Sequence, residues 1–538
     1  MKVDLSAPGR AANLARMASE SFDLVVVGGG IVGAGIARDA AMRGLKVALI
    51  DRGDFASGTS GKTSRLVHGG LRYLKNFKIG LVRQAVRERD LLLQRAPALV
   101  RPLAFTIPAY RNQGTGRSSL RLGLFLYDFL SRDKVLPRRQ WLSPEGVRKR
   151  EPKVRGASLL GGGLYHDALT NDARLVLAVV RAAADAGAVV ANYAEAIECV
   201  TEGGRIAGLR VRDRMSGNLT GIRASVVVNA TGVWLDWLRS SRPASQTIRP
   251  TKGIHLFLPR ERVGNRQAVV LSAKRDGRVI FVLPWGHLTL VGTTDTDFHG
   301  DPDHVVPDAD DVAYLLESVN EAFPEAHVGP QDVVSVYAGL RPLIHAKPDQ
   351  KESDISREHE ILEDPDGLIS VAGGKLTTQR AMAQDTVDLV CRRLGRPAVC
   401  STAFTPIGPN PAANASFAAL GFDEETATHL SSRHDPDSLR RWLEEPQSRE
   451  RIAPSLPYVW AEVCDAIEEE MALTLADVLV RRLGLFYESH DQGLSIARAT
   501  ADRMAHHLGW AEDRIRSEVT EYEELVADHR RFREDHGR

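Results

Sequence analysis

Residues 27–44, VGGGIVGAGIARDAAMRG, decide how this chain begins to fold. The apolar, β-branched run FDLVVV that leads into them predicts a buried parallel strand. The small residues that follow predict a helix packed close to the sheet, ending at Arg43-Gly44. LKVALID, residues 45–51, then predicts a second strand. A strand, a helix and a strand within about 30 residues form the context in which G-x-G-x-x-G binds a dinucleotide.

Each glycine of this fingerprint has a separate task. Gly28 makes the tight turn, Gly30 lets the backbone approach a pyrophosphate, and Gly33 lets the helix pack closely on the sheet. The phosphates then lie at the positive end of the helix. Asp51 closes the second strand, where its carboxylate can accept hydrogen bonds from ribose hydroxyls and would repel a 2′-phosphate.

Two distant segments favour FAD over NAD, which the fingerprint alone does not separate. VVVNATGVW (226–234) and GLISVAGGKLTT (367–378) put small residues at strand ends, as an extended cofactor requires. The amides around 373–375 open a helix and can hold negative charge on the edge of a flavin. A polar loop, 59–65, follows Asp51 and is a further expected contact. The predicted FAD contacts are Gly28, Gly30, Gly33, Asp51, Arg52, Thr59, Ser60, Ser64, His68, Ala230, Thr231, Gly232, Gly373, Gly374, Lys375, Leu376 and Thr377.

At 538 residues the chain is too long for one ordinary core. We predict an α/β fold in which a Rossmann-like FAD-binding domain is interleaved with a β-rich substrate domain, and an all-helical domain follows. The predicted parts are a loose N-terminal tail, 1–21; an FAD-binding domain, mainly 22–100, 155–240 and 365–400; a substrate domain, mainly 101–154 and 241–364; a linker, 401–416; and a helical domain, 417–538.

Charge and cysteine content narrow the class of protein. A formal net charge of +1 gives no argument for nucleic acid as a partner. Four cysteines without a C-x-x-C pair suit a reducing cytoplasm and predict no metal site. We see no signal peptide and no membrane-spanning run. The apolar segment 119–132 is expected to be a buried core helix; the alternative is a membrane contact, together with the basic segment 76–93.

The chain resembles the FAD-dependent glycerol-3-phosphate dehydrogenases of the aerobic, quinone-linked type. Two segments look like the family's signatures: the glycine-rich run 27–44 and GGKLTTQRAMA at 373–383. Others follow in the family's order, among them KTSRLVHGGLRYL (62–74), KGIHLFLP (252–259), YAGLRPL (337–343) and SREHEI (356–361). The resemblance covers roughly residues 22–400, extends to TLADVLVRR (474–482), and implies a fold like that of glycine and D-amino-acid oxidases. Gln379 stands where the family usually has tyrosine.

The resemblance implies a reaction. sn-Glycerol 3-phosphate is oxidised at C2 to dihydroxyacetone phosphate, FAD takes the hydride at N5, and a membrane quinone reoxidises the flavin. It also implies a cytoplasmic enzyme that docks peripherally on the inner face of the cell membrane, and it is compatible with a homodimer. The alternatives are an oxidase of the same substrate that reduces oxygen to peroxide, a flavoprotein that oxidises amines or amino acids, and a non-catalytic FAD-binding protein.

A phosphorylated substrate needs cationic groups, and oxidation of its alcohol needs a proton acceptor. For the phosphate and the reacting oxygen we predict Arg72, Arg341, Arg357 and Lys375, with hydroxyl contacts from Tyr73 and Thr294. For the base we favour His255, with Arg341 polarising the oxygen and Lys375 as a third catalytic group. The alternative base is His68, which we expect beside the flavin.

Overall fold

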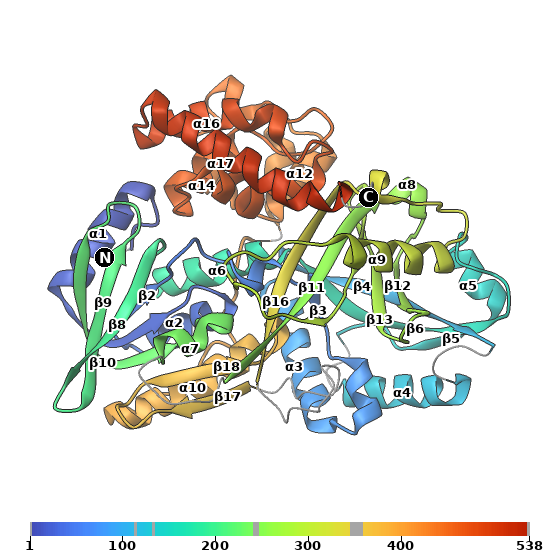
Figure 1. The fold of residues 1–538 in the computed structure, drawn as a ribbon, viewed down its shortest axis with the longest axis horizontal. Coiled ribbons are helices and arrows are strands. Elements are labelled where there is room, and N and C mark those ends of the chain that lie inside the picture. Colours follow the sequence, from blue (N-terminus) through green and yellow to red (C-terminus); the bar gives the residue numbers. More distant parts are fainter. Residues whose placement is uncertain are drawn as a thin grey trace.

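A computed structural model describes residues 3–111, 116–131, 135–239, 247–344, 359–410 and 412–534, except the side chains of Arg72, Lys75 and Asn76. It contains two large sheets with helices packed on them, and a group of C-terminal helices that lies across one end of both (Figure 1). This arrangement confirms the predicted fold class.

The first sheet carries the dinucleotide fingerprint. Its strand order is β17 (His359–Glu363), β18 (Ile369–Gly373), β10 (Leu219–Asn229), β1 (Ser21–Val27), β2 (Val47–Ile50) and β7 (Val189–Ala191). β18, β10, β1, β2 and β7 run parallel, and the antiparallel pair β8 (Ala194–Glu202) and β9 (Arg205–Asp213) extends β10. In the register, Val27 lies beside both Asn229 and Ile50.

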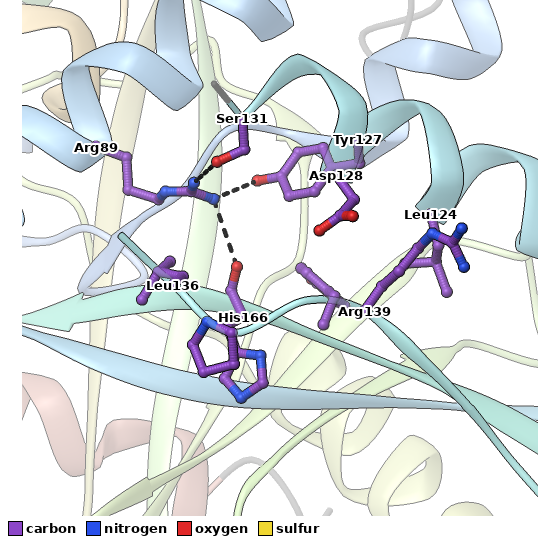
Figure 2. Close-up of a pocket in the computed structure, with 10 residues that line it drawn as sticks. Arg89, Leu124, Tyr127, Asp128, Ser131, Leu136, Arg139 and His166 are labelled. Atoms are coloured by element: carbon purple, nitrogen blue, oxygen red, sulfur yellow. Dashed lines mark hydrogen bonds between the residues drawn. The ribbon is translucent and has the colours of Figure 1, made fainter. Parts of the chain in front are cut away.

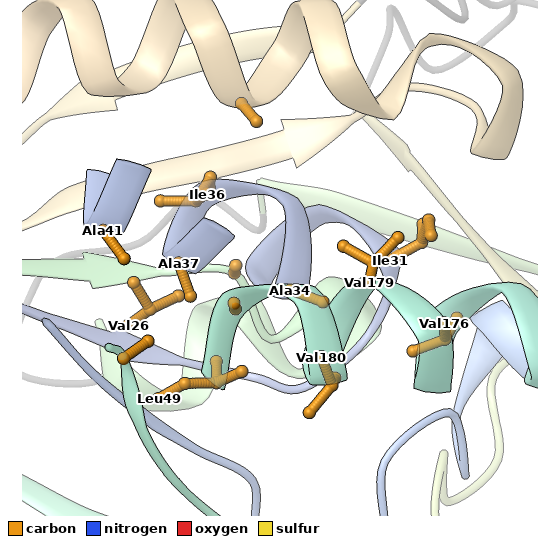
Figure 3. Close-up of a cluster of buried hydrophobic side chains, with 14 of the residues drawn as sticks. Val26, Ile31, Ala34, Ile36, Ala37, Ala41, Leu49, Val176, Val179 and Val180 are labelled. Atoms are coloured by element: carbon orange, nitrogen blue, oxygen red, sulfur yellow. The ribbon is translucent and has the colours of Figure 1, made fainter. Parts of the chain in front are cut away.

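Three helices cover one face of this sheet: α2 (Ile31–Met42), α6 (Asp172–Asp185) and α10 (Gln379–Leu394). Figure 3 shows Ala34 and Ala37 of α2 against Val179 and Val180 of α6, above Val26 and Leu49 of the strands. Alanine side chains at these positions let the two helices and the sheet approach closely. The apolar, small-residue pattern of the fingerprint therefore becomes the core of the first layer.

The second sheet is antiparallel almost throughout. Its order is β15 (Thr296–Asp297), β11 (Ile248–Pro259), β14 (Leu288–Gly292), β13 (Val279–Trp285), β12 (Ala268–Ser272), β4 (Val100–Tyr110), β6 (Leu159–Thr170) and β3 (Leu66–Val67), with β16 (Ser335–Ile344) on β11 and β5 (Gln140–Leu142) on β6. α9 (Ala309–Ala322) covers this sheet, and α3 (Ile79–Arg95) and α4 (Arg117–Leu130) lie together near its other side (Figure 1).

The strands do not keep to the predicted segment boundaries. β6 was expected in the FAD-binding part, but it pairs with β4 along most of its length in the second sheet. β17 was expected in the substrate part, but it is the edge strand beside β18 in the first sheet. Strand pairing between distant segments decides the sheet to which a strand belongs, and local composition does not reveal that pairing.

The N-terminal segment is not a loose tail, because residues 7–19 form α1 (Ala7–Ser19), begun by a cap from Ser6 to the Gly9 amide. Arg10 donates to the carbonyl of Asn192 at 2.8 Å, and Asn13 donates to the carbonyl of Val190 at 3.1 Å. Polar side chains therefore hold this helix on the first sheet. A search for apolar periodicity overlooks such a helix.

Helix α4 is not a buried core helix. Only Leu124 and Tyr127 are buried along it, whereas Leu122 is 60% exposed and Phe129 is 72% exposed. The apolar residues of α4 extend beyond the face that packs on the protein, so several of them are exposed. The described part of the chain contains no helix that is both long enough and apolar enough to span a bilayer.

The C-terminal part is helical, as predicted, and its main elements are α12 (Glu424–Ser431), α14 (Ala461–Glu469), a π-helix (Asp477–Leu483), α16 (Leu494–Leu508) and α17 (Glu512–Arg530). It encloses a buried group of ionisable side chains. His434 contacts Asp465 at 3.0 Å and Glu462 at 3.2 Å. Burial alone would lower the pKa of His434, but the hydrogen bonds and charges of these carboxylates raise it to about 9.

We predict that His434 stabilises the fold below about pH 9. Because its folded pKa exceeds the ordinary value of 6.5, its contribution is complete below pH 6.5 and is lost as pH rises through 9. The contribution is on the order of 3 kcal/mol. His434→Gln should lower the free energy of unfolding at pH 6 and flatten its decline between pH 6.5 and 9 in urea titrations. His287→Gln, in an exposed turn, is the control; an unchanged pH slope in His434→Gln would contradict the prediction.

Candidate functional site

The carboxyl ends of β1, β2, β10 and β18 meet at one edge of the first sheet. The backbone approaches itself there as closely as glycine allows. A Cβ atom on Gly33 would lie 1.8 Å from the carbonyl oxygen of Gly28, and one on Gly28 would lie 2.5 Å from the carbonyl oxygen of Ala230. The strand order reverses on the two sides of β1, and open α/β sheets bind their ligands at such a point.

The N-terminus of α2 is suited to an anion. Gly30 offers no side-chain cap, and the amide of Ile31 donates to the Ser60 hydroxyl at 3.0 Å. Ser60 thus lies at the positive helix end, where the sequence predicted a cofactor phosphate. Thr59, its neighbour, donates to the carbonyl of Leu340 at 2.7 Å and ties the predicted FAD loop to β16 of the second sheet.

Asp51 has a contact that the sequence did not predict. Its carboxylate accepts hydrogen bonds from the amides of Gly29 at 2.6 Å and Gly53 at 2.8 Å, so it holds the glycine turn directly. Burial raises the pKa of Asp51 to about 6, although both amides lower it. Each carboxylate oxygen has further acceptor capacity, and the expected contact with ribose hydroxyls stays a prediction.

The chain turns at the end of β10, where the sequence predicts a cofactor contact. Gly232 has a φ of +63°, and a Cβ atom on it would meet no heavy atom within 4 Å. The guanidinium of Arg52 lies 4.4 Å from the centre of the Trp234 ring and forms an ion pair with Asp303. The indole nitrogen of Trp234 is buried and has no hydrogen-bond partner among the residues that the structure describes. Thr231 donates to the Asn229 side chain at 2.7 Å.

The turn after β18 forms the second half of the predicted cofactor site. Gly373 and Gly374 have φ values of +70° and +90°, a left-handed backbone that favours glycine. Lys375 then begins the short 3-10 helix Leu376–Thr378, which runs into α10. The amide of His68 donates to the Thr377 hydroxyl at 3.1 Å, so His68 lies beside this turn, and its expected contact with the flavin stays a prediction.

The side chains of Lys375 and Tyr73 meet at the same turn. The Lys375 ammonium lies 3.8 Å from the centre of the Tyr73 ring, and Tyr73 is buried. Two other predicted substrate contacts fall outside the description: the side chain of Arg72 and the whole of Arg357 are not among the described residues. Gln379, the departure from the family pattern, begins α10 and is buried, with its side-chain oxygen 2.5 Å from a Cβ built on Gly35. It thus packs on α2.

His255 of β11 contacts the loop that connects the first sheet to the second. Its Nε2 atom lies 2.8 Å from the Ser64 hydroxyl of the predicted FAD loop, and its ring stacks on Tyr337 with centroids 5.0 Å apart. A Cβ on Gly292 would lie 2.1 Å from the ring, so only glycine fits opposite it. Burial, then the charges of Arg341 and Arg65, lower the pKa of His255 well below 6.5. The imidazole is therefore neutral at neutral pH, the form that can accept a proton.

Arg341 lies on β16, and residues that follow β14 hold its side chain in place. Its guanidinium donates to Asp295 at 3.0 Å and to the Thr293 hydroxyl at 2.9 Å. The Thr294 hydroxyl accepts the Ile254 amide at 3.0 Å and thus holds β11. Arg341 also donates to the carbonyl of Thr294 at 3.1 Å, and the predicted contact of the Thr294 hydroxyl with substrate stays a prediction.

Arg65, at the end of the predicted FAD loop 59–65, lies at the junction of three parts of the chain. Its guanidinium lies 4.3 Å from the Trp285 ring centre and 4.7 Å from that of Tyr487, which belongs to the C-terminal helices. Asp172 at the start of α6 lies 3.9 Å from it. These partners are far away in the sequence, and no local pattern near Arg65 indicates them.

A small pocket lies between α3, α4 and β6 (Figure 2). Buried Arg89 crosses it and donates to Asp167 at 2.7 Å, and the Tyr127 hydroxyl donates to the same carboxylate at 2.7 Å. The amide of Gly69 donates to the Tyr127 hydroxyl at 2.8 Å. Gly69 follows His68, so this network ties α4 to the predicted flavin side of the site.

Comparisons with known proteins agree with this geometry. Residues 23–389 match the family model described as "FAD dependent oxidoreductase", and residues 400–515 match "C-terminal domain of alpha-glycerophosphate oxidase". The chain is 39% identical over 544 residues to a glycerol-3-phosphate dehydrogenase of Mycobacterium leprae, covering 96% of this chain and 90% of the relative. It is 36% identical to an aerobic glycerol-3-phosphate dehydrogenase of Staphylococcus aureus, covering 95% of each.

Solved structures give the same result. The glycerol-3-phosphate dehydrogenase from Bacillus halodurans complexed with FAD is similar with a TM-score of 0.82 and 30% identity, over 98% of both chains. Glycine oxidase from Geobacillus kaustophilus has a TM-score of 0.53 at 22% identity, over 72% of this chain and 98% of that one, which shows a shared fold. These matches confirm FAD as the cofactor and the predicted kind of fold.

We predict that Gly232→Ala weakens FAD binding at least tenfold, because the new methyl group would enter the open space beside β10. Gly395→Ala is a matched control: Gly395 has a φ of +65°, no heavy atom lies within 4 Å of its Cβ position, and it lies beyond the far end of α10. Both variants should lose about 1–2 kcal/mol of stability from the left-handed backbone. Fluorescence titration of apoprotein with FAD measures the affinities; equal values for the two variants would place the cofactor away from Gly232.

Proposed function

We propose that this chain, which belongs to the FAD-dependent glycerol-3-phosphate dehydrogenase family, oxidises sn-glycerol 3-phosphate at C2 and passes the electrons to a membrane quinone. The observation that carries the proposal is the hydrogen bond between His255 and Ser64. It brings a neutral histidine of the second sheet to the loop 59–65, the predicted FAD contact that connects β2 to β3, and Arg341 is among the charges that act on this histidine.

Each residue of the proposed site has a separate role in oxidising the alcohol. Bound FAD would supply the acceptor for the hydride that leaves C2. Neutral His255 accepts the hydroxyl proton, and Ser64 orients its ring through Nε2. Lys375 and Arg341 supply positive charge for the phosphate and for the oxygen that becomes a carbonyl. The substrate loses one hydride and one proton, and a quinone that takes up two electrons and two protons balances the cycle.

Oxygen is the second candidate acceptor. The family model matched at residues 400–515 carries the name of an alpha-glycerophosphate oxidase, and such an enzyme would release peroxide. The two acceptors share the first half-reaction and differ only in how the flavin is reoxidised. An amino-acid substrate fits less well, because a carboxylate needs fewer cations than a phosphate dianion.

Anaerobic addition of glycerol 3-phosphate to the purified protein should bleach the yellow flavin absorbance. Glycine and proline at equal concentration should leave it unchanged. A short-chain quinone should then restore the colour faster than air-saturated buffer does, with little peroxide. Absence of bleaching by glycerol 3-phosphate would reject the substrate, whereas rapid recovery in air with stoichiometric peroxide would assign the oxidase reaction.

We predict that His255→Asn lowers kcat roughly 100-fold or more, the effect typical of a lost general base, with KM changed only a few-fold. Because the pKa of His255 lies well below 6.5, wild-type kcat/KM should stay level above pH 6.5 and fall only at more acidic pH. His68→Asn tests the alternative base in parallel. A large loss in His68→Asn with near-normal turnover in His255→Asn would transfer the role to His68.

Peripheral membrane docking through α4 and the start of α3 is supported by a surface patch. We define the docking patch by its exposed apolar residues: Phe77, Ile79, Leu122, Phe125, Leu126 and Phe129. Exposed Lys78, Arg83 and Arg121 lie on the same segments and suit anionic lipid. Exposed apolar patches on soluble domains mark interaction sites, and a lipid-soluble quinone makes a bilayer the fitting partner.

Phe125→Ser with Phe129→Ser should abolish co-sedimentation with vesicles that contain anionic lipid. Turnover with a water-soluble dye as acceptor should stay within about twofold, because both side chains lie outside the site. Phe404→Ser is the matched control, since Phe404 is 74% exposed in the segment after α10. Unchanged vesicle binding by the double variant would reject the docking patch.

A further inference from the structure

The buried carboxylate of Asp54 is one of the points at which the C-terminal helices contact the dinucleotide-binding part of the chain. Arg482 donates to Asp54 through both terminal nitrogens, one at 2.9 Å, and Arg481 donates to it through Nε at 2.6 Å. Asn192, at the end of β7, donates a further hydrogen bond at 3.0 Å. Asp54 is 1% exposed, so the carboxylate is almost completely enclosed by these donors.

The two arginines come from the π-helix Asp477–Leu483, in the segment TLADVLVRR that the proposed reaction does not use. The extra residue of a π-helical turn changes which side chains share a face, and such turns are frequent at functional sites. Asp477 anchors the same helix, because the Tyr193 hydroxyl donates to it at 2.7 Å. The charges of Arg482 and Arg481 lower the pKa of Asp54 despite its burial.

Asp54 belongs to the loop 51–55, and its neighbours in this loop contact the glycine turn. Asp51 accepts the amides of Gly29 and Gly53. Phe55 is buried, and its ring lies 2.4 Å from the Cβ position of Gly29, so no larger residue fits at 29. The loop 51–55 is therefore packed between the glycine turn on one side and the C-terminal arginines on the other.

We propose that Arg481 and Arg482 are positioning residues for FAD: by fixing Asp54, they hold the loop 51–55 against the glycine turn, so the C-terminal domain contributes to cofactor affinity. The inference uses FAD as the family's cofactor and does not depend on the electron acceptor or the base. Loss of one partner leaves the others buried without compensation, which moves the loop. If the C-terminal domain only stabilised the fold, changes at Asp54 or Arg482 would leave FAD affinity unchanged.

The test compares FAD affinity in Asp54→Asn, Arg482→Gln and the double variant, with Arg181→Ala as the matched control. Arg181 pairs with Glu469 at 3.1 Å between the same two parts of the chain, and this ion pair does not include Asp54. The dissociation constant comes from fluorescence titration of apoprotein, and circular dichroism checks folding. Arg481→Gln and Arg482→Lys, which remove less, are measured alongside in case a stronger variant does not fold.

We expect each single variant at Asp54 or Arg482 to raise the FAD dissociation constant at least tenfold, and the double variant to be no worse than the more affected single variant. Arg482→Lys should lie between wild type and Arg482→Gln. With saturating FAD, KM for glycerol 3-phosphate should stay within twofold. Unchanged FAD affinity in any folded variant at Asp54 or Arg482, additive losses in the double variant, or an equal loss in Arg181→Ala would overturn the proposal.

Discussion

The contact between α2 and the backbone of its own glycine turn is the constraint on which the rest of the structure depends. No side chain fits at Gly33, so the helix lies directly on the strand end, and its positive terminus points at the edge where β1, β2, β10 and β18 finish. Asp51 then fixes the turn from the neighbouring strand. A negatively charged, elongated cofactor is the ligand that such an edge is built to receive.

Much of the first sheet could be predicted from the sequence, because its signals are local. Glycine spacing, β-branched runs and small residues at strand ends each act within a few residues, and they located β1, α2, β2, β10 and the turn at Gly373. His255 was predicted from its residue type and from the family resemblance, and the structure adds its hydrogen bond to Ser64. The roles predicted for His255 and the cationic residues stay predictions.

What the sequence missed depends on partners that are distant in the chain. Arg65 gives no local sign of Trp285 and Tyr487, and Asp54 gives none of Arg482. Helix α1 is held by hydrogen bonds from Arg10 and Asn13, which apolar periodicity does not register. The prediction that α4 is buried was wrong for a different reason. Its apolar residues are evident in the sequence, but composition does not say whether protein or another surface covers them.

The parallel pairing of β1 with β10, and of β10 with β18, also has a consequence for synthesis. β1 is made first, yet its neighbour β10 begins at Leu219, the strand beyond that begins at Ile369, and the arginines that hold Asp54 come last. A ribosome therefore releases the glycine turn long before its surroundings exist. Until then the edge of β1 that β10 later covers needs protection from wrong pairing, and the strand edge at which the cofactor is expected is complete only after β18 has been made.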